Sequence, residues 1–244
     1  MMYTEIPQKK IYLQILEQIK NNIVTKQLKS GDRLPSERQL SEQLGVSRAT
    51  VREAIRALEM IGLVHCRQGE GNFITEDFDN TLTQPLSIMF WLNDGKVTEI
   101  HELRRSLETE AAKLAALHAT REDILRLEEI CAAIESEPNE AKSAELDKKL
   151  HDSIALYSRN KLIKDVLNSA STLIEELIKD MRTLILMEEV SASAINKQHR
   201  DIVASIRKHD PDAAARAMLT HMSFIEDFVS EVQKAIDIKN TEED

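Results

Sequence analysis

The sequence predicts a mainly α-helical protein of two domains, in which a small N-terminal domain also contains a β-hairpin and a larger domain consists of helices alone. Two observations predict the helices: the 244 residues include only 6 glycines and 5 prolines, and apolar residues recur with helical spacing along most of the chain. A third predicts the division, because Asp, Asn, Thr and Pro85 interrupt that spacing. We expect the first domain at 8–76, a linker at 77–95 and the second domain at 96–237.

Charge is distributed unevenly between these parts. The whole chain has a formal net charge of −10. Residues 1–75 contain 11 Lys and Arg against 8 Asp and Glu, so this part carries +3 and the remainder −13. A mildly basic first domain is compatible with local contact to nucleic acid, whereas phosphate repels the acidic remainder.

Cysteine usage and hydropathy indicate the compartment. Cys66 and Cys131 match no metal or redox spacing, which is typical of a reduced cytoplasmic protein. The N-terminus is polar, and no apolar run approaches the roughly 20 residues that span a bilayer. We therefore expect a soluble cytoplasmic protein with no export signal and no membrane partner.

Local signals predict the first two helices. Isoleucines recur every four residues between Ile11 and Ile23, which predicts a helix over about 10–28. Ser36 followed by Gln39 is the pattern of a capping box, so a second helix begins there. Gly45 is suited to end it, because glycine adopts a left-handed cap without steric cost.

A third helix and a hairpin complete the first domain. Ser47 caps a helix that reaches about Ile61, and the segments around Gly69 and Gly71 predict two short strands. One side of this helix is basic and the other is apolar; the basic side carries Arg48, Arg52 and Arg56, and the apolar side Val51, Ile55 and Leu58.

This order of elements is the layout of a winged helix-turn-helix, a DNA-binding fold. The alternative is a solvated charged face, which is common on amphipathic helices. Three signals favour DNA binding: the tight turn at 45–47, the arginines that follow it, and the glycine-bearing hairpin. Arginine suits this role because its planar fork binds guanine edges or phosphates through two hydrogen bonds.

The same residues resemble the GntR superfamily of transcription regulators. The similar segments are Leu34-Pro35-Ser36-Glu37-Arg38-Gln39-Leu40, Val46-Ser47-Arg48-Ala49-Thr50-Val51-Arg52-Glu53-Ala54, Gly62-Leu63-Val64 and Arg67-Gln68-Gly69-Glu70-Gly71-Asn72-Phe73-Ile74. The resemblance implies that the hairpin enters the minor groove and that the following residues contact DNA: Arg38, Ser47, Arg48, Thr50, Arg52, Gln68 and Gly69. Ser47 and Thr50 would serve mainly as a cap and a phosphate ligand.

The second domain is predicted to contain helices only. Helical periodicity predicts elements over about 97–118, 121–134, 143–157, 161–187, 192–208 and 212–237. Several of their apolar stripes contain polar residues, namely Arg104, Asp147, His151, His199 and His221. A lone histidine in such a stripe is usually a satisfied core residue. Three histidines and an aspartate facing inward from one bundle favour a metal site instead.

This region is similar to the FadR-like branch of the superfamily, whose C-terminal part is an antiparallel helical bundle called FCD. The similarity rests on 103–108 with Ala111-Ala112, on Asp147 and His151 leading to Asn160, and on His199 and His221. It implies that Asp147, His151, His199 and His221 bind a divalent metal, zinc or nickel, and that Arg104 pairs with a small carboxylate effector. The remaining histidines, His65, His101, His118 and His209, are interpreted as surface or cap residues.

Together these observations predict a homodimeric regulator that binds double-stranded DNA at a palindromic operator, with repression as the expected direction. The effector would act by favouring one arrangement of the dimer. Two alternatives stay open. One is a regulator whose metal is purely structural and which has no effector. The other is a metalloenzyme, which the sequence disfavours because it has no HExxH pattern and no evident general base.

Overall fold

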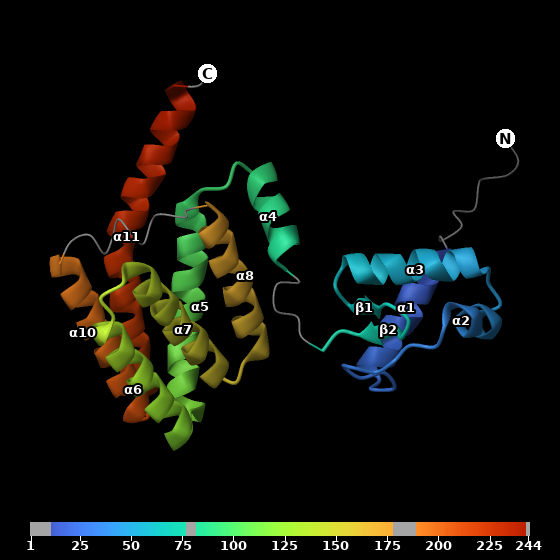
Figure 1. Cartoon of the computed structure of the whole chain (residues 1–244), viewed down its shortest axis with the longest axis horizontal. Helices are drawn as coiled ribbons and strands as arrows, with labels where there is room; N and C mark the ends of the chain where they lie inside the picture. The colour runs from blue at the N-terminus through green and yellow to red at the C-terminus, as the bar shows by residue number, and fades with distance from the viewer. Residues whose placement is uncertain (1–10, 77–81, 178–188, 243–244) are drawn as a thin grey trace, which may run out of the picture. The chain divides into compact units, whose positions relative to one another are not determined.

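The computed structural model of the chain describes residues 11–76, 82–177 and 189–242. It divides into two compact units, Met1–Thr81 and Leu82–Asp244 (Figure 1). The predictions for 8–10, for the linker residues 77–81 and for the helical residues 178–187 lie outside the described residues.

The first unit contains three helices and a two-stranded antiparallel sheet. Its elements are α1 (Ile11–Val24), α2 (Glu37–Leu44), α3 (Arg48–Met60), β1 (Val64–Arg67) and β2 (Gly71–Ile74). In the sheet Val64 is opposite Ile74, and both are buried. Val51 and Leu58 on α3 pack in the same core, together with Ile15 on α1. The apolar side of α3 therefore faces inward, as predicted.

Caps define where α2 and α3 begin and where α2 ends. Ser36 and Gln39 form the predicted capping box, in which each side chain accepts a hydrogen bond from the other's backbone N–H. Gly45 ends α2 in the left-handed region at φ +64°. Ser47 then accepts a hydrogen bond from the backbone N–H of Thr50. Because α3 starts immediately after this turn, its orientation relative to α2 is fixed by local geometry.

The second unit is a bundle of helices (Figure 1). Its described elements are α4 (Thr83–Leu92), α5 (Val97–His118), α6 (Arg121–Ser136), α7 (Glu140–Tyr157), α8 (Lys161–Leu177), α10 (Glu189–Arg207) and α11 (Pro211–Glu242). Helix α5 packs against α7, α8, α10 and α11. The core includes Leu127, Leu150, Ile202 and Met218, each fully buried. The mainly α-helical fold with one small sheet is thus confirmed.

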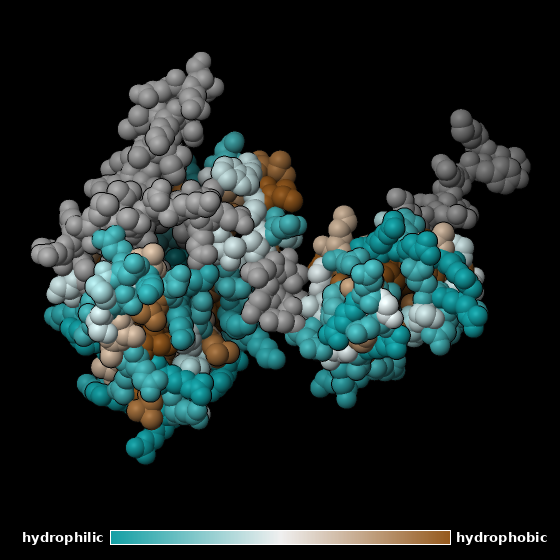
Figure 2. Space-filling view, viewed as in Figure 1, coloured by the Kyte–Doolittle hydropathy of each residue, from teal (hydrophilic) through white to brown (hydrophobic). Residues whose placement is uncertain are grey.

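Helix α4 lies within the stretch expected to be linker, and it belongs to the second unit. It packs against α8, and Phe90 contacts a small apolar cluster of Ile100, Ala170 and Leu173. Trp91 and Leu92 are 63% and 79% exposed, and Figure 2 shows hydrophobic surface over this helix. A ten-residue helix with apolar residues on several sides has little periodicity, so the sequence pattern does not distinguish it from an apolar patch in a linker.

No helix in the described part of the chain is long and apolar enough to span a membrane.

Candidate functional site

Three histidines from three helices meet in the core of the second unit. His151 on α7, His199 on α10 and His221 on α11 are all buried. Each offers a ring nitrogen that lies within 4.8 Å of those of the other two. The ring centroids of His199 and His221 are 4.7 Å apart. Imidazoles converging from facing helices are a common way to build a metal site inside a bundle.

Asp147 adds a carboxylate to this cluster. It precedes His151 by one helical turn, so both side chains lie on the same face of α7. One carboxylate oxygen, Oδ1, is 3.1 Å from Nε2 of His199, and Oδ2 is 3.9 Å from Nε2 of His151. Asp147 therefore lies beside two of the three histidines predicted as metal ligands, whereas the group with mutually close ligand atoms is His151, His199 and His221.

Hydrogen bonds from outside the cluster orient two of the imidazoles. Glu108 on α5 accepts a hydrogen bond from Nδ1 of His151, and Gln198 accepts one at 3.1 Å from Nδ1 of His221. An imidazole that donates from Nδ1 keeps the lone pair of Nε2 for a metal. Metal-binding histidines typically have such a partner on the other nitrogen.

The residues fit a divalent cation. Nε2 of His221 is buried and has no hydrogen-bond partner among the described residues, an arrangement that costs about 1–3 kcal/mol unless something else satisfies the atom. Burial, with a smaller contribution from His151 and His199, holds the pKa of His221 well below its usual value, so the ring is neutral. Neutral imidazole with carboxylate is a donor set that suits zinc or nickel.

Arg104 lies one turn before Glu108 on α5 and is paired with it. Its Nε and Nη2 atoms donate to Oε1 of Glu108 at 2.9 and 2.5 Å. Burial alone would raise the pKa of Glu108, but Arg104 and His151 outweigh it and hold that pKa well below its usual value. The two bonds use two of the five N–H donors of the guanidinium. Arg104 is thus placed beside the cluster through Glu108.

Glu108 is not among the site residues predicted from the sequence, although the sequence contains a signal for it. Glu108 follows Arg104 by four residues and precedes Ala111-Ala112, so it shares an inward-facing side of the helix. The interpretation of His101 as a surface or cap residue is wrong. His101 is 2% exposed, and its Nε2 lies 2.9 Å from the carbonyl oxygen of Met222 on α11.

The other three histidines lie outside the cluster. His118 is exposed at the end of α5. His209 follows α10 with φ +53°, and its Nδ1 lies 2.8 Å from the carbonyl oxygen of Ala116, which agrees with a cap position. His65 stacks on Phe73 in the hairpin.

In the first unit the predicted contact residues lie at the start of α3, on α2 and at the hairpin turn. Ser47 and Thr50 are joined through their hydroxyls at 2.8 Å, and Arg48 is the first residue of α3. Arg38 is exposed on α2. Gln68 and Gly69 are exposed in the turn between β1 and β2, where Gly69 has φ +80°.

Arg52 is held by a carboxylate of α2. Its Nη2 donates to Oε2 of Glu37 at 2.8 Å, and its Nε is 3.1 and 3.2 Å from the two carboxylate oxygens. The hydrogen bond from Arg52 lowers the pKa of Glu37. Glu37 therefore orients the guanidinium that the sequence singled out on the basic side of α3.

Comparison with known proteins gives two family matches that divide along the chain. Residues 11–74 match the family of bacterial regulatory proteins called gntR, and residues 99–224 match the FCD domain. The regulator LutR of Bacillus subtilis is 33% identical over 206 residues, which are 84% of this chain and 94% of that protein. The putative L-lactate dehydrogenase operon regulatory protein of Escherichia coli is 30% identical over 87% of this chain and 83% of its own length.

A third relative and a solved structure agree with these matches. The transcriptional repressor NanR of Escherichia coli is 30% identical over 90% of this chain and 84% of its own. The structure of Streptococcus agalactiae GntR superimposes with a TM-score of 0.65 at 27% identity, and covers 88% of this chain and 98% of that one. The relatives are named as regulators of transcription, not as enzymes.

Proposed function

The chain belongs to the GntR family of bacterial transcription regulators and carries an FCD domain, and from this premise we propose that a small carboxylate, bound beside a divalent metal in the second unit, sets the affinity of the first unit for its operator. Binding of DNA follows from the family. The metal, the effector and the direction of regulation are the proposal.

The observation that carries it is the buried cluster of His151, His199 and His221. In the proposal these three imidazoles and Asp147 hold the metal, and the metal supplies a Lewis-acid site for one oxygen of the effector. Arg104 supplies the second contact, because a guanidinium with donors left over can pair with a carboxylate. Glu108 keeps Arg104 and His151 in place.

The relatives suggest which carboxylates to test first. One of them carries the name of an L-lactate dehydrogenase operon, which makes lactate and pyruvate the first candidates, followed by sugar acids and dicarboxylates. NanR is named as a repressor, and we propose the same direction here, with release from DNA when the effector binds. The protein would act in the cytoplasm as a homodimer whose two first units contact the half-sites of a palindrome.

Such an effector can change DNA affinity only through a difference in its own affinity for two arrangements of the protein. The cluster draws on α7, α10 and α11, and Glu108 links it to α5, which packs against all three. A ligand bound there contacts the helices that make up most of the bundle, so it can favour one packing of the bundle over another.

The test is a thermal-shift screen of the full chain, loaded with zinc or with nickel, against a panel of small carboxylates. A rise in Tm for one acid, lost in His199→Ala and kept in His118→Ala, supports the proposal. His118 is exposed and lies outside the cluster, so it is the matched control. A flat response across the panel, with collapse of the second unit on chelation, would instead establish a structural metal without an effector.

A further inference from the structure

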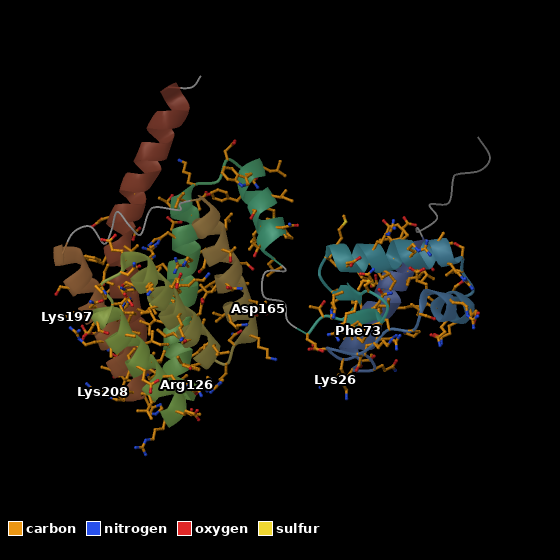
Figure 3. The ribbon with its side chains drawn as sticks, in the orientation of Figure 1. Lys26, Phe73, Arg126, Asp165, Lys197 and Lys208 are labelled. Carbon is orange, nitrogen blue, oxygen red and sulfur yellow. The ribbon has the colours of Figure 1, made fainter. Side chains whose placement is uncertain are left out.

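The outer face of the hairpin carries a row of stacked side chains. His65 on β1 lies directly opposite Phe73 on β2, and their rings stack with centroids 5.8 Å apart. Arg67 lies two residues beyond His65 on the same face, and its guanidinium is 4.7 Å from the centre of the Phe73 ring. Nε of Arg67 also donates to Nε2 of His65 at 3.1 Å. Figure 3 labels Phe73 on this hairpin.

A second arginine reaches the same ring from outside the hairpin. Arg33 forms an isolated antiparallel bridge with Phe73, and its guanidinium is 6.0 Å from the ring centre. Gly71 leaves room for it, because a Cβ at that position would lie 3.3 Å from Nε of Arg33. Gly71 also has φ +111°, which other residues rarely adopt. Stacking on an aromatic ring holds both guanidinium groups in position without neutralising them.

The two arginines line a polar hollow of about 800 Å³ between the hairpin and the start of α2. Gly69 of the hairpin turn and Ser36 and Gln39 of the helix start also line it. One carboxylate is present, that of Glu37, and it is bound by Arg52. The hollow is therefore lined by two arginines and by one carboxylate that already has a cationic partner.

We propose that Arg33 and Arg67 bind a phosphate of the DNA backbone in this hollow. If α3 lies in the major groove and the hairpin turn in the adjacent minor groove, the sugar-phosphate strand that separates the two grooves must pass between these elements. The hollow lies between the hairpin and α2, whose Glu37 contacts α3. Guanidinium groups match phosphate geometry, and such contacts set register without reading sequence. Phe73 is a positioning residue for both arginines.

The test uses the full chain and a duplex that the wild-type protein selects from a random library. Affinity for this duplex and for a scrambled one is measured by fluorescence anisotropy over a fourfold range of salt. The variants are Arg33→Gln, Arg67→Gln and Phe73→Leu. The control is Lys20→Gln, which removes an exposed charge beside Leu58 and Ile61, at the opposite end of α3 from Ser47.

Each lost phosphate contact should make the fall of log K with log salt shallower by about 0.9 for each bound unit. As salt rises fourfold, the ratio of wild-type to variant affinity should therefore narrow about 3.5-fold for one bound unit and about 12-fold for a homodimer with both units bound. Arg33→Gln and Arg67→Gln should each reduce the affinity for the selected duplex and for the scrambled duplex by the same factor. Phe73→Leu should bind more weakly with the wild-type slope, because it keeps both charges.

Three results would overturn the proposal. The first is a wild-type slope in both arginine variants. The second is a loss confined to the selected duplex, which would mean that these arginines contact bases. The third is an equal change of slope in Lys20→Gln, which would mean that only the net charge of the unit matters. Wild-type affinity in Phe73→Leu would overturn the positioning role of the ring.

Discussion

The buried carboxylate of Glu108 accepts a hydrogen bond from Nδ1 of His151, which lies 43 residues further along the chain. Its Oε1 atom accepts two hydrogen bonds from Arg104. One carboxylate thus orients a proposed metal ligand and the arginine proposed to bind the effector. The proposed metal and effector contacts therefore depend on the same side chain.

Replacing Glu108 by Gln should weaken metal binding while leaving the helices intact. The amide is similar in size, but it has no charge to hold the His151 ring in the orientation and tautomer that present Nε2. Loss of such an outer hydrogen-bond partner typically costs 10- to 100-fold in metal affinity. Isothermal titration of the chelator-treated full chain with zinc measures this loss, and circular dichroism reports the helical content.

Glu122→Gln is the matched control for that variant. Glu122 pairs with Arg126 at the same spacing that relates Arg104 and Glu108, but its side chain is 75% exposed and lies on α6. Zinc affinity should be unchanged there. Equal affinity in Glu108→Gln and wild type would show that the His151 ring does not need Glu108 for its orientation.

Metal binding should stabilise the second unit through His221. At a free zinc concentration about 100 times Kd, a cation bound only by the folded state adds about 2.7 kcal/mol to the free energy of unfolding. His221 is fully buried with Nε2 among the other imidazoles, so His221→Ala should abolish the increase. Urea denaturation with zinc and with chelator measures it, and His118→Ala should behave as wild type. An undiminished increase in His221→Ala would exclude His221 as a ligand.

Local signals were sufficient to predict the first unit. The Ser36–Gln39 capping box, the left-handed Gly45 and the Ser47 cap each depend on residues within one turn of one another, so the sequence shows them directly. The spacing of Asp147 and His151 is equally local. Their meeting with His199 and His221 depends on how the helices pack, and the sequence predicts it from polar residues in apolar stripes together with resemblance to a family.

Long-range contacts explain what the sequence did not predict. The bond between Glu108 and His151 joins two helices, and no local pattern specifies it. The sequence predicts His101 as a surface or cap residue because it matches no ligand position of the family. Helix α5 packs against four other helices, so it buries more than one face, and His101 lies on a side that α11 covers. Helix α4 was missed for a related reason, since its apolar residues show no single face.

Burial of His101 should make the metal-free protein less stable in mild acid. Burial lowers the pKa of His101 below its usual 6.5, although the Met222 carbonyl opposes this effect. The unfolded chain therefore binds the proton more readily than the folded protein. The free energy of unfolding is not reduced by His101 above about pH 6.5, and it falls as the pH drops below that value. Denaturation at several pH values with chelator present measures the slope.

His101→Gln should make that slope shallower. Glutamine can still donate a hydrogen bond to the Met222 carbonyl but does not titrate. Some slope should persist, because the pKa of His221 is also lowered by burial. His118→Gln is the control, since His118 is exposed and its removal should leave the slope as in wild type. An unchanged slope in His101→Gln would show that His101 does not contribute to the acid sensitivity.

Arg52 should contribute more to the preference for the selected duplex over a scrambled one than to the stability of the first unit. Its pair with Glu37 is partly exposed, with 55% and 30% of the two side chains accessible, so Arg52→Ala should leave the thermal midpoint of the first unit unchanged. Loss of a bidentate contact to a base should reduce affinity for the selected duplex roughly 5- to 150-fold, with little effect on a scrambled one. Arg52→Lys keeps the charge but not the planar fork, so it should also lose discrimination while retaining the wild-type salt slope. Anisotropy titrations of both duplexes measure the ratio, and full discrimination in either variant would place base recognition at another residue.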